Sequence, residues 1–167
     1  MIIDKNLPDW VGTSTVVKFF YVFSKFEHAL KSNGYIKGDV DIKELKDGTK
    51  TEPCWIKFSK KMPDDFLKES NNVHVVELFE NPPRRQIILA GKLDFEKNGR
   101  AITNTQQVFE AISLVRNNLF HGGKYYISDL VSEASRDEPL LKACLYVLNA
   151  ALEVNKEVRE TFLTPLA

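Results

Sequence analysis

The spacing of apolar residues predicts three long helices, of which the first runs from about Thr13 to Asn33. Apolar side chains recur in this segment at steps of three and four, which places them on one helical face. Thr13 or Ser14 can cap the helix, and Gly34 can end it because glycine adopts positive φ without strain. We expect its core face to be Val16, Phe19, Phe20, Phe23, Phe26 and Leu30, whereas Lys18, Lys25, Glu27, His28 and Lys31 lie off that face.

The second helix is predicted from about Asn104 to Phe120 or His121. Thr103 or Asn104 can cap it, and the pair Gly122-Gly123 stops it. Its expected core face is Val108, Ala111, Ile112, Val115 and Leu119.

The third helix is predicted to begin near Asp137, with Pro139 in its first turn, and to continue to about Phe162. A short connecting helix is predicted just before it, over 128–134. The apolar ridge of the third helix is expected to be Leu141, Leu145, Leu148, Leu152 and Phe162.

The segment between the first two helices has shorter and less regular patterns. Large apolar and polar residues alternate from Trp55 to Phe58, which favours a short strand. Residues 64–68 predict a short helix, and residues 73–79 fit a helix that must end before two prolines. Residues 87–91 and 93–95 read as one or two short strands.

The composition is that of a folded globular chain, with 43% hydrophobic and 28% charged residues in a length of 167. That length suits one domain of ordinary size. Lys and Arg total 23, as do Asp and Glu, so the net charge is zero. Zero net charge excludes binding of nucleic acid through bulk positive charge, and an anionic partner would need a local basic cluster.

Two cysteines, Cys54 and Cys144, are too few for a disulfide framework and lack metal-ligand spacing. We expect both to be reduced, with Cys144 packed in a helix. The first residues lack the pattern of a signal peptide, and no stretch approaches the roughly 20 apolar residues of a membrane span. The chain is therefore predicted to be soluble and cytoplasmic, with no membrane partner.

The last turns of the second helix carry the candidate chemistry. Arg116 and His121 are five positions apart and point about 140° away from each other on a straight helix, whereas Asn117 and His121 share a face. Arg116 lies beside the core face, and Phe109 and Phe120 form a second apolar strip just beyond it. Two apolar strips with an arginine between them predict packing on two sides, as at a dimer interface.

Arginine and histidine without clustered carboxylates suit cleavage of a phosphodiester without a metal, by attack of a ribose 2′-hydroxyl on the adjacent phosphate. Arg116 can bind phosphate through two N–H groups. His121 lies at the negative end of the helix dipole, which favours imidazolium, and the following glycines leave room for a substrate. From spacing alone, a surface ion pair of Arg116 and a helix-capping His121 remain the alternative.

The string from Val115 to Lys124 closely resembles the signature of the HEPN superfamily, the helical domains of many prokaryotic toxins and RNases. That signature is an arginine, four to six residues and a histidine, commonly with a polar residue after the arginine, which here is Asn117. The resemblance extends to residues 26–35, to residues 82–86 and to the leucine-rich final helix. Residues 36–72 resemble no part of the family.

The resemblance implies a mainly α fold, a HEPN-like bundle of four to five helices with a short extended or β insertion between the first helix and the motif helix. It implies a single domain over 1–167, with residues 36–100 as an irregular insertion of short helices or strands. It also implies a homodimer whose two motif helices line one cleft. In that cleft Arg116 would bind the scissile phosphate, His121 would act as general base or acid, and Asn117 would orient the histidine or contact the phosphate.

The activity so implied is that of a metal-independent endoribonuclease, a toxin or anti-phage effector, which needs no cofactor and leaves a 2′,3′-cyclic phosphate on RNA. Residues expected to bind substrate are Lys124, Arg84, Arg85, Glu27 and Lys31. An antitoxin or nucleotidyltransferase is a further implied partner. Gly123 stands where some of these toxins carry the tyrosine that such a transferase modifies, which leaves Tyr125 or Tyr126 for that role.

Two other functions remain open at this point. One is a non-catalytic HEPN module that binds RNA, a nucleotide or a partner protein in the same cleft. The other is a plain helical interaction domain in which the motif is coincidental.

Overall fold

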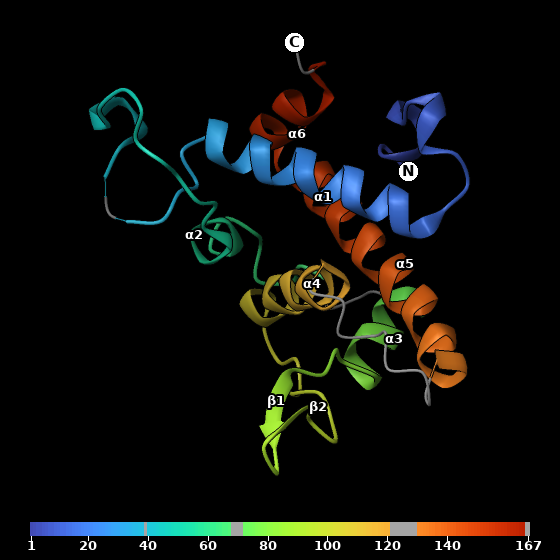
Figure 1. Ribbon diagram of the computed structural model, residues 1–167. Helices are drawn as coiled ribbons and strands as arrows, with labels where there is room; N and C mark the ends of the chain where they lie inside the picture. Colours follow the sequence, from blue (N-terminus) through green and yellow to red (C-terminus); the bar gives the residue numbers. More distant parts are fainter. Residues whose placement is uncertain (39, 68–71, 121–129, 166–167) are drawn as a thin grey trace. The chain divides into compact units, whose positions relative to one another are not determined.

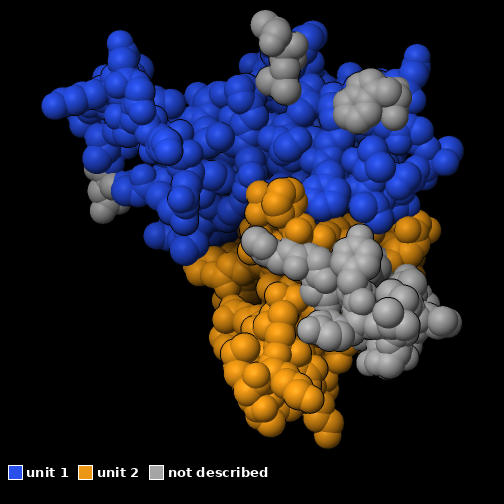
Figure 2. All heavy atoms as spheres, viewed as in Figure 1, with its two compact units in different colours: residues 1–64, 148–167 blue, residues 65–147 orange. Residues whose placement is uncertain are grey.

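The computed structural model describes residues 1–38, 40–67, 72–120 and 130–165, with Trp10 and residues 130–137 described for their backbone only. The chain forms two compact units (Figure 2): unit 1 contains residues 1–64 and 148–167, and unit 2 contains residues 65–147. The elements of the described chain are α1 (Thr15–Ser32), α2 (Trp55–Ser59), α3 (Val73–Glu80), β1 (Gln86–Leu89), β2 (Lys92–Phe95), α4 (Thr105–Phe120), α5 (Leu130–Val154) and α6 (Lys156–Leu163), with short 3-10 turns at Asp4–Asn6, Asp9–Val11 and Ile42–Glu44 (Figure 1).

The fold is mainly helical with one small two-stranded sheet, which confirms the predicted fold class at that level. Residues 36–100 contain α2, α3 and the hairpin, as predicted for the segment between the first helix and the motif helix. The described chain has six α-helices where four to five are predicted, because α2 and α6 are separate helices. The HEPN-like bundle and the single domain stay predictions. None of the described helices has the length and apolar character needed to cross a membrane.

α1 begins and ends where the sequence predicts. The Ser14 hydroxyl accepts a hydrogen bond from the Val17 N–H at 3.4 Å, and Gly34 takes φ +77° after the last turn. Four residues of the predicted core face, Phe19, Phe23, Phe26 and Leu30, are buried.

Two residues of α1 differ from their predicted environment. Val16 is 40% exposed, since it lies in the first turn. Lys25 is buried although it lies off the phenylalanine face, because α6 packs against α1 and covers it. Its ammonium nitrogen lies 5.2 Å from the ring centroid of Phe162 and 5.8 Å from that of Tyr21. Burial lowers the pKa of the Lys25 ammonium below its ordinary value.

The predicted strand at Trp55–Phe58 is wrong, since this segment forms the short helix α2. Three positions apart on a helix, Trp55 and Phe58 share a face. There the Trp55 ring stacks on Phe26 at 5.5 Å, and the Phe58 ring meets Phe26 edge-on at 5.5 Å. Four residues are too few to separate a period of 2 from one of 3.6, so packing against α1 decides the conformation.

The short helix predicted over 64–68 is also wrong. Residues 64–67 form a turn, and Lys68 lies outside the described residues. Leu67 takes φ +66°, a left-handed conformation that a continuing helix cannot contain.

The C-terminal part of the chain forms two helices where one is predicted. α5 ends just before Asn155, whose side-chain oxygen accepts a hydrogen bond from the Val158 N–H at 3.0 Å and so starts α6. α5 begins at Leu130, earlier than predicted, and takes in the described part of the short helix predicted at 128–134. Pro139 therefore lies inside α5 and not in a first turn, which removes one helical hydrogen bond there.

In unit 2, β1 and β2 form the antiparallel pair that residues 87–95 predict, with Leu89 opposite Lys92. The connecting residues Ala90 and Gly91 have φ +50° and +74°, the two positive values of a type I′ turn. α3 ends before the two prolines, also as predicted. Unit 2 thus presents a short hairpin beside α3 and α4 (Figure 1).

Candidate functional site

α4 holds the first of the predicted catalytic residues. Its cap is Asn104, whose side chain accepts a hydrogen bond from the Gln107 N–H at 2.9 Å. The predicted core face is confirmed, with Leu119 half-buried and four residues buried: Val108, Ala111, Ile112 and Val115. Because that face is held in the core, Arg116 falls at its edge and is half-buried.

The Arg116 guanidinium is held by two neighbouring side chains. Its Nη1 donates a hydrogen bond to Asn117 Oδ1 at 2.9 Å, and its Cζ lies 5.1 Å from the ring centroid of Phe120. The Phe120 ring is 66% exposed. These three side chains form an open surface at the end of α4, which we call the α4-end cluster. The guanidinium is therefore oriented before a ligand binds.

The other predicted members of the catalytic motif, His121 and Lys124, lie outside the described residues, as do Tyr125 and Tyr126. Asn117 is exposed, and its side-chain oxygen accepts from Arg116. This bond gives Asn117 a role that the sequence does not predict, the positioning of the arginine.

Asn118 has a structural role that the sequence reasoning missed. It is buried, and its Nδ2 donates to the Arg84 carbonyl oxygen at 2.9 Å. Asn118 lies about 200° around the helix from Arg116, so the Arg84 backbone is on the opposite side of α4. The Arg84 guanidinium lies over the Phe95 ring, 5.6 Å from its centroid. Within one chain, the Arg84 backbone and the Arg116 side chain therefore lie on different sides of α4.

Arg85 is exposed and lines a small hollow of about 120 Å³ together with Arg100 and Glu110. Arg100 forms an ion pair with Glu96 at 3.7 Å, and Glu110 accepts a hydrogen bond from Gln106 at 2.7 Å. The hollow therefore mixes charges of both signs. Its residues do not form the purely basic cluster that an RNA backbone would favour.

The predicted second apolar strip of α4 is wrong for one of its two members. Phe109 belongs to the core of unit 2, where it is fully buried and stacks on Phe66 with ring centroids 6.0 Å apart. Phe120 is exposed at the other end of the helix. Residues 64–67 supply this packing partner, which the pattern of α4 alone does not reveal.

Glu27 and Lys31, the predicted contributions of the first helix, are half-buried on α1. They belong to unit 1, whereas the α4-end cluster belongs to unit 2. Their place in a shared cleft stays a prediction.

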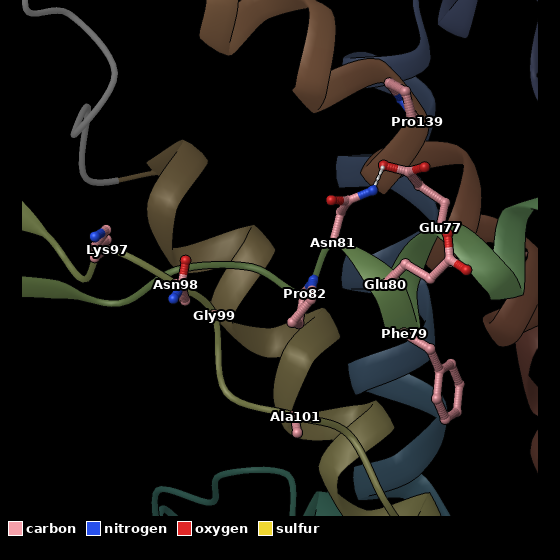
Figure 3. A pocket seen from close by; sticks show the side chains of 10 residues that line it. All are labelled: Glu77, Phe79, Glu80, Asn81, Pro82, Lys97, Asn98, Gly99, Ala101 and Pro139. Carbon is pink, nitrogen blue, oxygen red and sulfur yellow. Dashed lines mark hydrogen bonds between the residues drawn. The ribbon is translucent and has the colours of Figure 1, made fainter.

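A larger hollow of about 560 Å³ lies beside the end of α3 (Figure 3). Asn81 donates to the Glu77 carboxylate at 3.1 Å on its rim, and Pro139 lines it as well. A Cβ at Gly99 would lie 2.2 Å from the Pro82 carbonyl oxygen, so only glycine lets these two segments approach so closely. The hollow was not predicted, because the sequence does not show that residues 97–101 return to the two prolines.

The two free cysteines differ in exposure, since Cys54 is half-buried and Cys144 is buried. Cys144 is fully buried in α5, as predicted, and burial raises the pKa of its thiol well above the ordinary range. Within the described part of the chain, no group of three or more His, Cys, Asp or Glu could hold a metal ion.

Comparisons with protein-family models, with curated proteins and with solved structures found no match to this chain. The resemblance of residues 115–124 to the HEPN signature therefore stands on those residues and on the helices predicted around them.

Proposed function

We propose that the chain is a metal-independent endoribonuclease of the HEPN type, acting in the cytoplasm as a toxin or anti-phage effector. The observation that supports it is the α4-end cluster. There a half-buried Arg116, oriented by Asn117 and Phe120, lies five residues before His121 in the sequence. A guanidinium held in place beforehand can stabilise charge on a phosphate without reorganising during the reaction.

In the proposed reaction, the ribose 2′-hydroxyl attacks the adjacent phosphorus and the 5′-oxygen of the next nucleotide leaves. His121 removes the proton from the attacking hydroxyl or donates one to the leaving oxygen. Arg116 donates N–H groups to the phosphoryl oxygens as negative charge builds on them. The products are a 2′,3′-cyclic phosphate and a free 5′-hydroxyl.

The proposal includes a homodimer with a HEPN-like fold. On a straight helix that continued to His121, Arg116 and His121 would point about 140° apart and could not both reach one phosphate. In a two-fold dimer of α4 helices, Arg116 of one protomer and His121 of the other can converge on it. Lys124 would then add positive charge beside the cleft, and an antitoxin would act by covering it.

The test compares cleavage by Arg116→Ala and His121→Ala with that of two matched controls. Arg159→Ala removes another half-buried helical arginine, and His28→Ala removes an exposed helical histidine. End-labelled RNA is incubated with each folded variant in EDTA, and the fragment ends are analysed. We expect the two motif variants to lose roughly 10²- to 10³-fold in rate and the controls to retain theirs.

Full cleavage by either motif variant would refute the proposed roles. RNA binding without cleavage, with or without divalent metal, would instead identify a non-catalytic binding module. If light scattering shows a monomer at micromolar concentration, the site shared by two protomers does not form, and this part of the proposal is refuted.

A further inference from the structure

The β1–β2 hairpin exposes apolar side chains that its own unit does not cover. Ile88 is 69%, Leu89 57% and Leu93 49% exposed. The hairpin extends away from α3 and α4 in unit 2 (Figure 1). Ile88 lies directly opposite Leu93, so the two form one apolar patch on one face of the sheet. Monomeric proteins normally cover or charge the open edges of exposed apolar strands. The uncovered apolar side chains of this hairpin therefore indicate a contact surface.

The hydrogen-bond pattern shows which backbone groups face outward from β2. Glu96 N–H donates to the Arg85 carbonyl at 2.9 Å, so these two residues form a hydrogen-bonded pair of the ladder. Hydrogen-bonded and non-hydrogen-bonded pairs alternate along an antiparallel ladder. The backbone N–H and C=O groups of Phe95 and Leu93 therefore point away from β1. The Phe95 N–H indeed turns away from β1 and donates to Asp94 Oδ1 at 2.7 Å. The Leu93 backbone groups likewise point away from β1, because Leu93 and Ile88 form a non-hydrogen-bonded pair of the ladder.

The charges of β2 are complementary to those of a second, antiparallel copy of itself. If a two-fold axis passes beside Leu93, Leu93 of one chain faces Leu93 of the other. Lys92 of each chain then faces Asp94 of the other, because both are one residue from the axis. Neither Lys92 nor Asp94 has an ion-pair partner among the described residues. The edge of β1 lacks this complementarity. A two-fold axis beside Ile88 would place no oppositely charged residues of the two β1 strands opposite each other.

We propose that β2 binds β2 of a second copy of this chain, antiparallel and centred on Leu93, to form a four-stranded sheet. The two Leu93 residues exchange two backbone hydrogen bonds. Asp94 Oδ1 keeps its bond to Phe95, and Oδ2 accepts from Lys92 of the second copy. Ile88 and Leu93 of both copies then form one continuous apolar face, and the charged pairs lie on the other face. This contact uses no residue of α4 and does not depend on the proposed ribonuclease activity.

Charge reversal tests the inference with the full-length chain. Lys92→Asp places two carboxylates opposite each other at both ends of the contact, and Asp94→Lys places two ammonium groups there. By sedimentation velocity, we expect each single variant to raise the dissociation constant of the self-association on the order of tenfold or more. Lys97→Asp, the same charge change just beyond β2, is the matched control and should associate like the wild type.

Mixing the two single variants provides the decisive measurement. In the mixed dimer every aspartate faces a lysine, so native mass spectrometry should show the heterodimer in preference to either homodimer. The double variant K92D/D94K should likewise regain wild-type association. The inference would be overturned if both charge reversals left the dissociation constant of self-association unchanged. A monomeric wild type, or a mixture that forms no heterodimer, would also overturn it. Assemblies of wild-type size that persist in both single variants would overturn the inference. Dimers left by both variants from a larger wild-type assembly would support it, because those dimers would use the separate α4 contact of the proposed function.

Discussion

The hydrogen bond from Asn118 to the Arg84 carbonyl leads to a sharp prediction about the motif helix. Asn118 is 8% exposed, and its bond of 2.9 Å joins α4 to the segment that leads into β1. Asn118→Ala removes the donor and with it this hydrogen bond between α4 and the Arg84 carbonyl oxygen. Asn117→Ala is a matched control, because it removes the same side chain from the next, exposed position of the same helix.

The expected magnitude follows from burial. Loss of a part-buried hydrogen bond costs on the order of 1 kcal/mol. Replacing Asn by Ala also raises helix propensity by up to about 0.7 kcal/mol, but equally in both variants. The difference between the two variants should therefore be about 1 kcal/mol in the free energy of unfolding. With a urea slope of about 2 kcal/mol/M, the midpoint of Asn118→Ala should lie roughly 0.5 M below that of Asn117→Ala.

Urea titrations followed by circular dichroism and by tryptophan fluorescence measure this difference. Agreement of the two signals establishes a two-state transition, on which the comparison depends. Asn118→Asp should destabilise at least as much as Asn118→Ala, because it places a carboxylate against the carbonyl oxygen. Equal midpoints for Asn117→Ala and Asn118→Ala would refute the reasoning that the buried amide holds α4 to the hairpin.

Two further predictions concern the turn of the hairpin and the buried lysine. Ala90 takes φ +50°, where asparagine is better tolerated, so Ala90→Asn should raise the thermal midpoint through a gain of about 1 kcal/mol. No gain, or a loss, would contradict the type I′ turn. Burial lowers the pKa of Lys25, so between that pKa and 10.5 the unfolded chain holds more protons. Unfolding titrations from pH 7 to about 10 should then show the wild type gaining stability relative to Lys25→Met, and a flat difference would contradict it.

Long periodic segments are the part of the fold that sequence predicts best. α1 and α4 each repeat their apolar spacing over at least four turns and carry a capping side chain, so competing periods are excluded. The four residues from Trp55 to Phe58 fit two periods equally well, and the stacking of Trp55 on Phe26 decides between them. The break between α5 and α6 depends on one polar residue, Asn155, within a charged stretch that otherwise continues a helical pattern.

The candidate site was predictable in position but not in contacts. The place of Arg116 at the edge of the core follows from the angle between residues on a helix. Its bond to Asn117 depends on side-chain rotamers, and the bond from Asn118 depends on a segment 34 residues away along the chain. The burial of Lys25 likewise depends on α6, which is distant in sequence. Such effects come from tertiary neighbours, which a local pattern does not encode.

The close approach at Gly99 has a consequence for how this chain can vary over evolution. Any other amino acid would place a Cβ 2.2 Å from the Pro82 carbonyl oxygen, so a single mutation at this codon meets backbone, which cannot move aside as a flexible side chain can. Another residue can be accepted at position 99 only after the length of the loop over residues 97–101, or one of the two prolines, has changed. Descendants of this sequence that keep both segments should therefore inherit glycine at position 99, whatever ligand the neighbouring hollow comes to bind.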